Sequence, residues 1–251
     1  MIKLKSQREL AIMREAGAIV AGCHAVLKDY VKPGISTAEL DQVAENFLRQ
    51  KGATPSFKGY RGFPASICTS INDVVCHGIP GSQLLQPGDV ISIDIGAYYK
   101  GYHGDSAWTY AVEPVDPKIA HLMAIGEECL YAGIAQAVDG NRMGDLAHAV
   151  QSVAEGHGYG VVRDFVGHGI GRDLHEPPEV YHAGEPNTGI HLTTGMVLCI
   201  EPMITMGDWR VTMDPDGWTV RTRDGSIAVQ FEHTVAITDQ GPEILTQLPG
   251  D

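Results

Sequence analysis

The two halves of this sequence repeat one another, block by block and in the same order. A block at 86–96, "QPGDVISIDIG", returns 107 residues later as "TTGMVLCIEPM" (193–203). A second block at 38–52, "AELDQVAENFLRQKG", returns after 106 residues as "GDLAHAVQSVAEGHG" (144–158), and "VCHGIP" (75–80) is echoed by "VGHGIG" (166–171). Blocks that recur in order at a nearly constant spacing indicate a duplicated structural unit. We therefore expect a single domain over residues 1–251, built from two pseudo-symmetric halves of roughly 1–112 and 113–251.

Hydrophobic periodicity predicts two helices followed by strands in each half. The expected helices span Ser6 to about Tyr30, 37–52, 117–138 and 143–157. The expected strands are a pair within 87–112 and single strands at 195–205 and 227–238. In the first helix, five residues lie near one face: Leu10, Met13, Gly17, Val20 and Leu27. Ser36 or Thr37 can cap the second helix. The pattern predicts an α+β fold.

The composition excludes several classes of partner. A net charge of −13 argues against nucleic acid or an anionic membrane as the main partner, because neither attracts an acidic body. Five scattered cysteines without a CxxC pair fit free thiols in a reducing compartment. The N-terminus has no signal-peptide core, and no segment reaches the roughly 18 uncharged apolar residues of a membrane span. We expect a cytoplasmic protein.

Each half carries two carboxylates inside apolar strand sequences: Asp94 in "ISIDIG", Asp105 in "HGDSAW", Glu201 in "LCIEPM" and Glu232 in "VQFEHT". One such residue normally faces solvent, but four at duplicated positions converge if both hairpins face a pseudo-twofold axis. Four neighbouring anions raise one another's pKa values unless cations lie between them. Two divalent metals would neutralise the cluster, and oxygen ligands with one imidazole favour Mn²⁺, Fe²⁺ or Co²⁺, with Zn²⁺ also allowed. Such metal pairs form a hydrolytic clamp.

Other catalytic motifs are incomplete or absent. The stretch "HEPPEVYH" (175–182) is not a zinc-binding HExxH helix, because Glu179 stands where the second histidine belongs and two prolines precede it. The stretch "GHGIGR" (167–172) lacks the third glycine of a dinucleotide-binding loop. There is no GxSxG and no P-loop.

Seven motifs in a fixed order resemble those of the type I methionine aminopeptidases: "MREAG" (13–17), "NDVVCHGIP" (72–80), "DIGAYYKGYHGDSAWT" (94–109), "GHGIGRDLHEPP" (167–178), "IEPM" (200–203), "DGWTV" (216–220) and "FEHT" (231–234). The resemblance covers essentially the whole chain and is to the short bacterial form. It implies the duplicated "pita-bread" fold, with antiparallel sheets inside and helices outside. This fold agrees with the repeat found from the sequence itself.

The resemblance also implies a role for particular residues. It assigns the ligands of two divalent ions to Asp94, Asp105, His168, Glu201 and Glu232, of which Asp105 and Glu232 bridge both ions. A bridging water would attack the first peptide carbonyl, and Glu201 would take its proton as general base. His77 and His175 would contact the substrate and stabilise the tetrahedral intermediate. His233 is expected to face away from its neighbour Glu232.

A pocket for the methionine side chain is implied as well, because a flexible thioether suits an aromatic cage with a sulfur contact. Its expected lining is Phe57, Tyr60, Phe63, Cys68 and Trp218. Leu174 stands where the family usually has Phe, which bears on the shape of the pocket and not on the chemistry. Some relatives hold a monovalent cation, and the resemblance leaves open such a site near Asn72 and Val74.

The implied activity is removal of the initiator methionine from nascent proteins and peptides when the second residue is small. The implied partner is the nascent chain, with transient ribosome contact left open, and the implied state is a monomer without a nucleic-acid or membrane partner. Two alternatives stay open. A proline-specific aminopeptidase or prolidase shares the fold, but usually carries a large additional N-terminal domain. A non-enzymatic binding member of the fold would lack metal ligands, whereas all five are present here.

Overall fold

The computed structural model describes residues 2–247. Its helices are α1 (Gln7–Lys28), α2 (Thr37–Gln50), α3 (Pro117–Ala135) and α4 (Met143–Gly156), with a short 3-10 turn at Tyr60–Gly62. The strands of the first half are β1 (Thr54–Pro55), β2 (Cys68–Ile71), β3 (Val74–Cys76), β4 (Val90–Tyr99) and β5 (Tyr102–Ala111). The strands of the second half are β6 (Gly160–Val161), β7 (Gly167–Gly169), β8 (Glu176–Val180), β9 (Val197–Ile200), β10 (Met203–Thr205), β11 (Val211–Met213), β12 (Val220–Thr222), β13 (Ala228–Gln230), β14 (His233–Thr238) and β15 (Gly241–Ile244).

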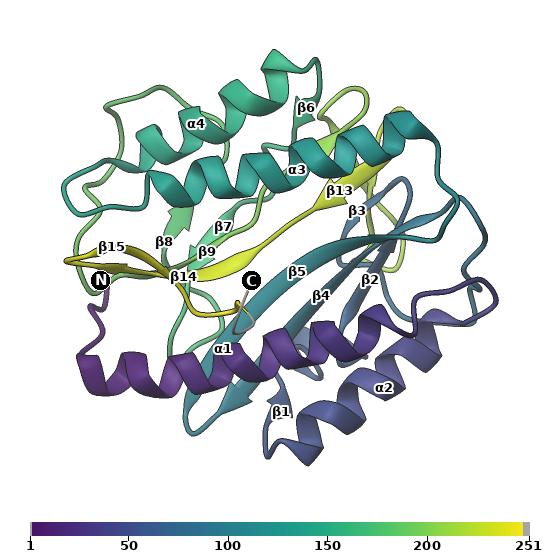
Figure 1. The fold of residues 1–251 in the computed structure, drawn as a ribbon, viewed down its shortest axis with the longest axis horizontal. Coiled ribbons are helices and arrows are strands. Elements are labelled where there is room, and N and C mark those ends of the chain that lie inside the picture. The colour runs from purple at the N-terminus through teal and green to yellow at the C-terminus, as the bar shows by residue number, and fades with distance from the viewer. Residues whose placement is uncertain (1, 248–251) are drawn as a thin grey trace.

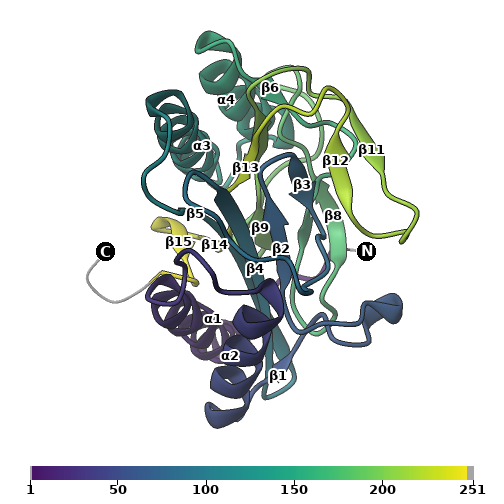
Figure 2. The same cartoon turned by 90° about the vertical axis from the view of Figure 1, so that its right-hand side faces the viewer.

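The helices form two pairs on opposite sides of the strands. In Figures 1 and 2, α1 and α2 lie below the strands, and α3 and α4 lie above them. The β4–β5 hairpin belongs to one antiparallel sheet with β1 and β2, and β15-β14-β9-β7-β8 forms another. Two smaller antiparallel sheets have the orders β13-β10-β6 and β11-β12-β3. The strands thus occupy the interior between the helix pairs.

The four expected helices are present and somewhat shorter than the periodicity predicts. Ser6 and Ser36 cap α1 and α2, each through a capping box with the glutamate three residues later. The helices expected to reach residues 30, 52, 138 and 157 end at Lys28, Gln50, Ala135 and Gly156. Each ends before a turn, so the sequence placed these helices correctly and misjudged their last residues.

Helix α1 is long and apolar enough to cross a membrane by length and composition alone. Here it packs on β4 and β5. The five residues expected on its apolar face are all buried. A helix that buries one face in a protein core passes the same length and composition test, so we assign it no membrane role.

The duplication recurs in the backbone hydrogen bonds. The N–H of Gly88 donates to Val112 O at 2.8 Å, and the N–H of its repeat partner Gly195 donates to Ile237 O at 2.9 Å. Both glycines have a φ of +95°, a conformation that side chains disfavour. The starts of α2 and α4 are held alike, since the N–H of Thr37 donates to Gln83 O and that of Met143 to Ile190 O, each at 3.0 Å. These paired contacts confirm two copies of one unit.

The prediction of two continuous strands in the second half is wrong in one respect, because each strand is interrupted. The strand expected at 195–205 divides into β9 and β10, and the strand expected at 227–238 divides into β13 and β14. Pro202 lies in the first gap and cannot donate a hydrogen bond to a sheet. At both gaps the chain passes between the five-stranded and a three-stranded sheet. Glu201 and Glu232 therefore stand where the strands change sheets, whereas Asp94 and Asp105 lie within continuous strands.

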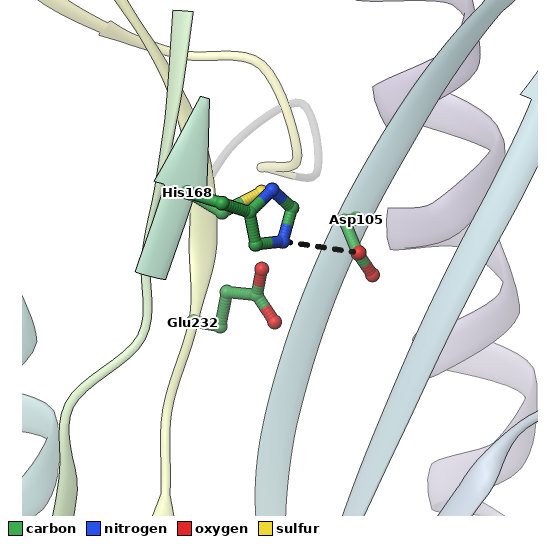
Figure 3. A group of neighbouring side chains, drawn as sticks. Asp105, His168 and Glu232 are labelled. Atoms are coloured by element: carbon green, nitrogen blue, oxygen red, sulfur yellow. Dashed lines mark ion pairs between the residues drawn. The ribbon is translucent and has the colours of Figure 1, made fainter. Parts of the chain in front are cut away.

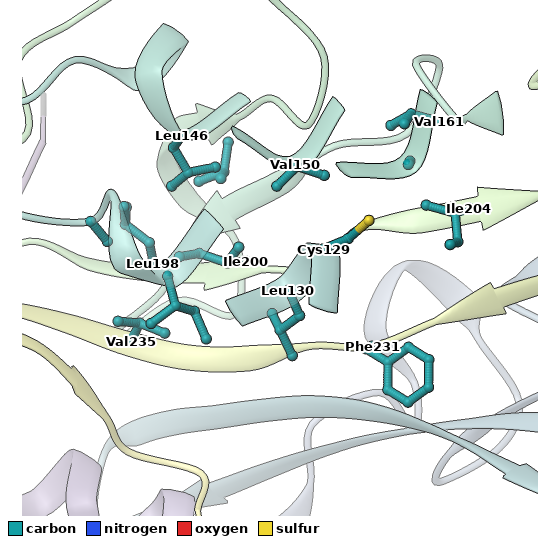
Figure 4. Close-up of a cluster of buried hydrophobic side chains, with 14 of the residues drawn as sticks. Cys129, Leu130, Leu146, Val150, Val161, Leu198, Ile200, Ile204, Phe231 and Val235 are labelled. Atoms are coloured by element: carbon teal, nitrogen blue, oxygen red, sulfur yellow. The ribbon is translucent and has the colours of Figure 1, made fainter. Parts of the chain in front are cut away.

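Separate hydrophobic clusters support the two halves. In the second half, side chains of α3 and α4 such as Leu130 and Leu146 pack with Leu198 and Val235 of the sheet (Figure 4). A comparable cluster packs α1 and α2 on β4 in the first half. All five cysteines are free and buried, which confirms the expected thiols. The segments that carry the four acids are thus anchored from both sides.

Candidate active site

Asp94 and Asp105 project from the same face of the β4–β5 hairpin. Asp94 pairs with Ala107 and Asp105 pairs with Gly96, so the two acids are diagonal neighbours on one face. Their carboxyl groups are close enough to shift each other's pKa. Cys68 on β2 pairs with Asp94 from the other side and is buried. The first half thus presents two carboxylates beside one thiol.

The second half brings two more carboxylates and an imidazole to the same place. His168 Nε2 lies 4.0 Å from Asp105 Oδ2 and 3.7 Å from Glu201 Oε1. Ligand atoms of Asp105, His168, Glu232 and Cys199 lie within 4.8 Å of one another. Figure 3 shows Asp105 on β5, His168 on β7 and Glu232 on the segment between β13 and β14 pointing toward a common centre. The structure therefore brings the predicted ligand residues of both halves together.

Among the described residues, almost no positive charge lies near the four acids. Burial raises the pKa of Asp94 to about 7. Burial and then mutual repulsion raise the pKa values of Asp105, Glu201 and Glu232 well above the ordinary range. Within residues 2–247, His168 is the one basic side chain that forms an ion-pair contact with them. The cluster lacks counter-charge.

Three buried carboxylate oxygens have no hydrogen-bond partner among the described residues: Asp94 Oδ1, Asp105 Oδ1 and Glu232 Oε1. Buried polar atoms without partners are rare in proteins, and each calls for an explanation. Divalent cations would pair with these oxygens and offset the repulsion. The donor set of carboxylate oxygens with one imidazole, next to the Cys199 thiol, therefore fits divalent cations.

His168 is prepared to offer a lone pair to a cation. Its Nδ1–H donates to the Gly169 carbonyl at 2.9 Å, which leaves Nε2 as the acceptor facing the acids. Burial lowers the pKa of His168 to about 4, so the ring is neutral at pH 7. The flanking glycines permit this placement, because a Cβ on Gly167 would lie 2.2 Å from Cys199 O and one on Gly169 would lie 2.4 Å from Pro177 O.

His175 stands beside His168, with 4.1 Å between the two ring centres. The Tyr60 hydroxyl lies 2.8 Å from His175 Nδ1, and the two rings are stacked. If the hydroxyl donates, the proton of the imidazole resides on Nε2 and is available to a substrate. Desolvation and then His168 lower the pKa of His175, which keeps it neutral at pH 7. His77 lies edge-on to Trp218 at 6.4 Å and to Phe165 at 5.6 Å.

The residues expected around the methionine side chain gather in one cluster next to these histidines. Its members include Phe57, Tyr60, Phe63, Cys68 and Trp218. Phe63 and Trp218 pack edge to face at 5.1 Å. Leu174 is buried in the same cluster, so its substitution for a larger ring changes the packing there. Burial raises the pKa of Cys68 well above 9.0, which keeps its thiol uncharged.

Asn72 belongs to the region where the family resemblance leaves open a monovalent cation. It has a left-handed backbone with φ +56°, and its carbonyl oxygen accepts the N–H of Ala228 at 2.9 Å.

The prediction that His233 faces away from Glu232 is confirmed, because His233 lines a separate cavity of about 720 Å³ behind the hairpin, together with Trp108 and Ser106.

Sequence reasoning missed several residues that support the site. His182 is buried, and its Nε2 accepts the Glu201 N–H at 3.0 Å. Gln230 Nε2 lies 3.4 Å from Glu201 Oε2. Glu176 closes the loop between the two histidines and forms an ion pair with Lys5. His182 and Glu176 both lie in the histidine-rich stretch, but nothing local indicates their partners.

Comparison with known proteins gives a consistent result. The chain matches metallopeptidase family M24 over residues 11–239. It is 54% identical to methionine aminopeptidase 1 of Bacillus subtilis, with 99% of this chain and 100% of that protein covered. The crystal structure of methionine aminopeptidase from Rickettsia prowazekii superposes with a TM-score of 0.97 at 42% identity and covers 98% of this chain and 100% of its own.

Prolidases share the fold at a greater distance. The prolidase from Pyrococcus furiosus has a TM-score of 0.77 at 24% identity, and this chain spans 65% of its length. These likenesses confirm the duplicated pita-bread fold expected from the sequence. The sequence identity to the methionine aminopeptidases is higher than to the prolidases and extends over the full length of both chains, so it decides between these two groups of relatives. The chain therefore belongs to metallopeptidase family M24 and, within it, to the methionine aminopeptidases.

Proposed function

We propose that this protein removes the N-terminal methionine from peptides and nascent proteins whose second residue is small. The whole chain, 1–251, would act as a single catalytic domain. The cations would be held by Asp94, Asp105, His168, Glu201 and Glu232, as the motif resemblance implies. The observation that carries the proposal is the convergence of these side chains with three carboxylate oxygens left unpaired. The identity of 54% to a methionine aminopeptidase supports the choice of methionine over proline substrates.

The proposed base is Glu201. When bound, two divalent cations supply positive charge that makes a water nucleophilic near neutral pH and polarises the scissile carbonyl. Glu201 would accept the proton of the attacking water. Its backbone is fixed by His182, and its carboxylate is adjacent to the Gln230 amide. These contacts hold the base in one orientation.

His175 would donate its Nε2 proton to the carbonyl oxygen as negative charge develops there. The Tyr60 hydroxyl supports this role, because its hydrogen bond to His175 Nδ1 leaves the proton of the imidazole on Nε2. His77 would also contact the substrate, beside Trp218. The aromatic cluster with Cys68 would then receive the methionine side chain, since a thioether packs well against rings.

Finer features are also part of the proposal. The physiological cation is one of Co²⁺, Mn²⁺, Fe²⁺ or Zn²⁺, and a monovalent cation near Asn72 and Val74 is an additional candidate. The protein would act in the cytoplasm as a monomer that meets the nascent chain, with transient ribosome contact. Elemental analysis of protein purified anaerobically, followed by reconstitution with single metals, identifies the cation.

The activity is tested with four peptides on the reconstituted enzyme. Met-Ala-Ser should be cleaved, whereas Leu-Ala-Ser and formyl-Met-Ala-Ser should be refused, because the site needs a methionine with a free amine. Equal turnover of the Met and Leu peptides would contradict the specificity. Preferential cleavage of Ala-Pro would instead indicate a prolidase. An inert protein that binds both cations would favour a binding role.

A further inference from the structure

The two halves meet along a row of buried hydroxyl groups between the β4–β5 hairpin and the β13–β14 segment. We call this row the hydroxyl seam: Ser92, Ser106, Thr109 and Thr234, each at most 3% exposed. Ser92 and Thr109 hydroxyls lie 2.8 Å apart, and Thr109 Oγ1 donates to Gln230 O at 2.8 Å. Side-chain hydroxyls thus supply much of the bonding between the halves where a sheet would use its backbone.

Thr234 bonds to both backbone groups of Asp105. Its Oγ1 donates to Asp105 O at 2.7 Å and accepts from Asp105 N–H at 3.0 Å. Asp105 needs these bonds, because its register in the hairpin turns its N–H and C=O away from β4. A single buried hydroxyl therefore fixes the peptide groups on both sides of the Asp105 side chain.

Glu232 is held by the opposite half in a corresponding way. The Ser106 hydroxyl donates to Glu232 O at 2.6 Å, and the N–H of Glu232 donates to Ala107 O at 2.8 Å. Ser106 directly follows Asp105, and Thr234 lies two residues after Glu232. Each of the two carboxylate residues is thus fixed by a hydroxyl from the neighbourhood of the other.

We propose that Thr234 and Ser106 are positioning residues that set the separation of the Asp105 and Glu232 carboxylates across the two halves. The inference rests on the proposed cation site, to which both carboxylates belong. Without the Thr234 hydroxyl, two buried backbone groups of Asp105 lose their partners, and β5 shifts to recover hydrogen bonds. The carboxylates then no longer meet at the distance that shared cations need. Partners of metal ligands commonly affect affinity by 10–100-fold.

The test compares cation binding by apo forms of four proteins. Thr234→Val removes the hydroxyl and keeps the shape, and Thr234→Ser keeps the hydroxyl. Thr205→Val is the matched control, since the hydroxyl of buried Thr205 donates, among residues 2–247, to Gly207 O and Asp208 O. Calorimetric titration with Co²⁺ measures affinity, and the Co²⁺ absorption spectrum reports ligand geometry.

We expect Thr234→Val to bind Co²⁺ about 10–100-fold more weakly with an altered spectrum. Thr234→Ser and Thr205→Val should resemble the wild type. Wild-type affinity and spectrum in Thr234→Val would overturn the inference while leaving the cation site intact. A wild type that binds no Co²⁺ would refute the cation site, and the inference with it.

Ser106→Ala provides a second test of the proposal in case the Thr234→Val protein does not fold. It removes one bond to Glu232 and leaves the bond to Ala107 in place. We expect the same direction of change in affinity and spectrum with a smaller size. An unaltered titration and spectrum for Ser106→Ala would contradict the reciprocal arrangement.

Discussion

Lys5 and Glu176 form a buried ion pair that holds the loop carrying His175. Lys5 Nζ lies 2.6 Å from Glu176 Oε2, and the two side chains are 6% and 2% exposed. The other oxygen of Glu176 accepts the N–H groups of Arg172 and Asp173 at 3.0 and 3.3 Å. Lys5 itself is fixed because its N–H donates to Gly195 O at 2.7 Å. An N-terminal residue thus neutralises the carboxylate that shapes the loop between the two histidines.

Replacing Lys5 by Met keeps the apolar stem and removes the ammonium group. Removing one partner of a buried ion pair costs about 3–5 kcal/mol, because the other charge stays buried. Two backbone donors and the exposed Lys3 ammonium, 3.8 Å from Glu176 Oε1, remain for Glu176, so we expect about 3 kcal/mol, the lower end of this range. For a chain of this size that corresponds to a decrease of roughly 6–12 °C in Tm. Differential scanning calorimetry of Lys5→Met measures the change, and kcat/KM on Met-Ala-Ser should fall as His175 loses its support.

The effect depends on pH in a defined direction. Burial tends to raise the pKa of Glu176, but the Lys5 hydrogen bond and charge, together with the Asp173 N–H and the Lys3 charge, outweigh it, so the pKa is below 4.5 in the folded protein. A lowered carboxyl pKa adds stability above the unfolded value, and this stability is lost as pH falls through the folded value. In Lys5→Met the two largest lowering contributions are lost while burial, the largest single contribution, remains, so we expect the pKa of Glu176 to rise. The difference between the two proteins should therefore be largest near pH 7 and shrink below about pH 4.

Two further proteins decide whether the charge is the cause. Glu176→Gln added to Lys5→Met removes the stranded anion and keeps an acceptor for the two N–H groups, so it should recover most of the lost stability. Lys100→Met breaks a pair of the same 2.6 Å length whose side chains are 52% and 48% exposed, and it should leave Tm essentially unchanged. Equal losses in Lys5→Met and Lys100→Met, or no recovery in the double variant, would refute the reasoning.

Three other outcomes are expected. Glu201→Gln keeps a ligating oxygen and should lower kcat by roughly 10²–10⁴, the usual contribution of a general base, and near-normal kcat with cations bound would exclude that role. In a metal titration, His168→Ala should bind cations weakly and regain activity in excess metal. His175→Ala should bind cations normally and lose roughly 10²–10³ in kcat/KM, and excess metal should not restore the activity. The reverse pattern would exchange the roles of the two histidines. Removing the metals with a chelator should make stability fall as pH rises from about 4 to 7, since the raised pKa of Asp94 favours folding only while its carboxyl is protonated. Denaturant midpoints with and without metal measure this, and parallel pH profiles would contradict it.

The sequence was sufficient wherever the information is local or repeated. Asp94 and Asp105 lie in a hairpin whose strands read directly from alternation and a glycine turn, and the structure has those strands unbroken. The repeat then pointed to Glu201 as the counterpart of Asp94, because the same apolar frame surrounds both. It also predicted continuous strands there, which is wrong. A sequence repeat predicts which residues face inward better than it predicts the sheet to which these residues belong.

Contacts between distant residues left no comparable signal. Thr234 and Asp105 are 129 residues apart, and Lys5 and Glu176 are 171 apart. A threonine in an apolar strand or a lysine near the N-terminus is an ordinary residue until the fold supplies its partner. The hydroxyl seam and the Lys5–Glu176 ion pair therefore depend on tertiary packing, which hydrophobic periodicity does not encode.

The different fates of the two repeated histidines show how the duplicated unit became an asymmetric site. His168 is on β7, which pairs with β9 directly before Glu201, and Gly167 makes that close approach possible. In the first half, Cys76 occupies the place of Gly167, and its strand β3 pairs with β12 instead. His77 then follows with a φ of +57° and lies against Trp218 and Phe165. One copy thus reaches the acids while the other is directed to the aromatic cluster, so the same three-residue motif would supply a ligand in one half and a substrate contact in the other.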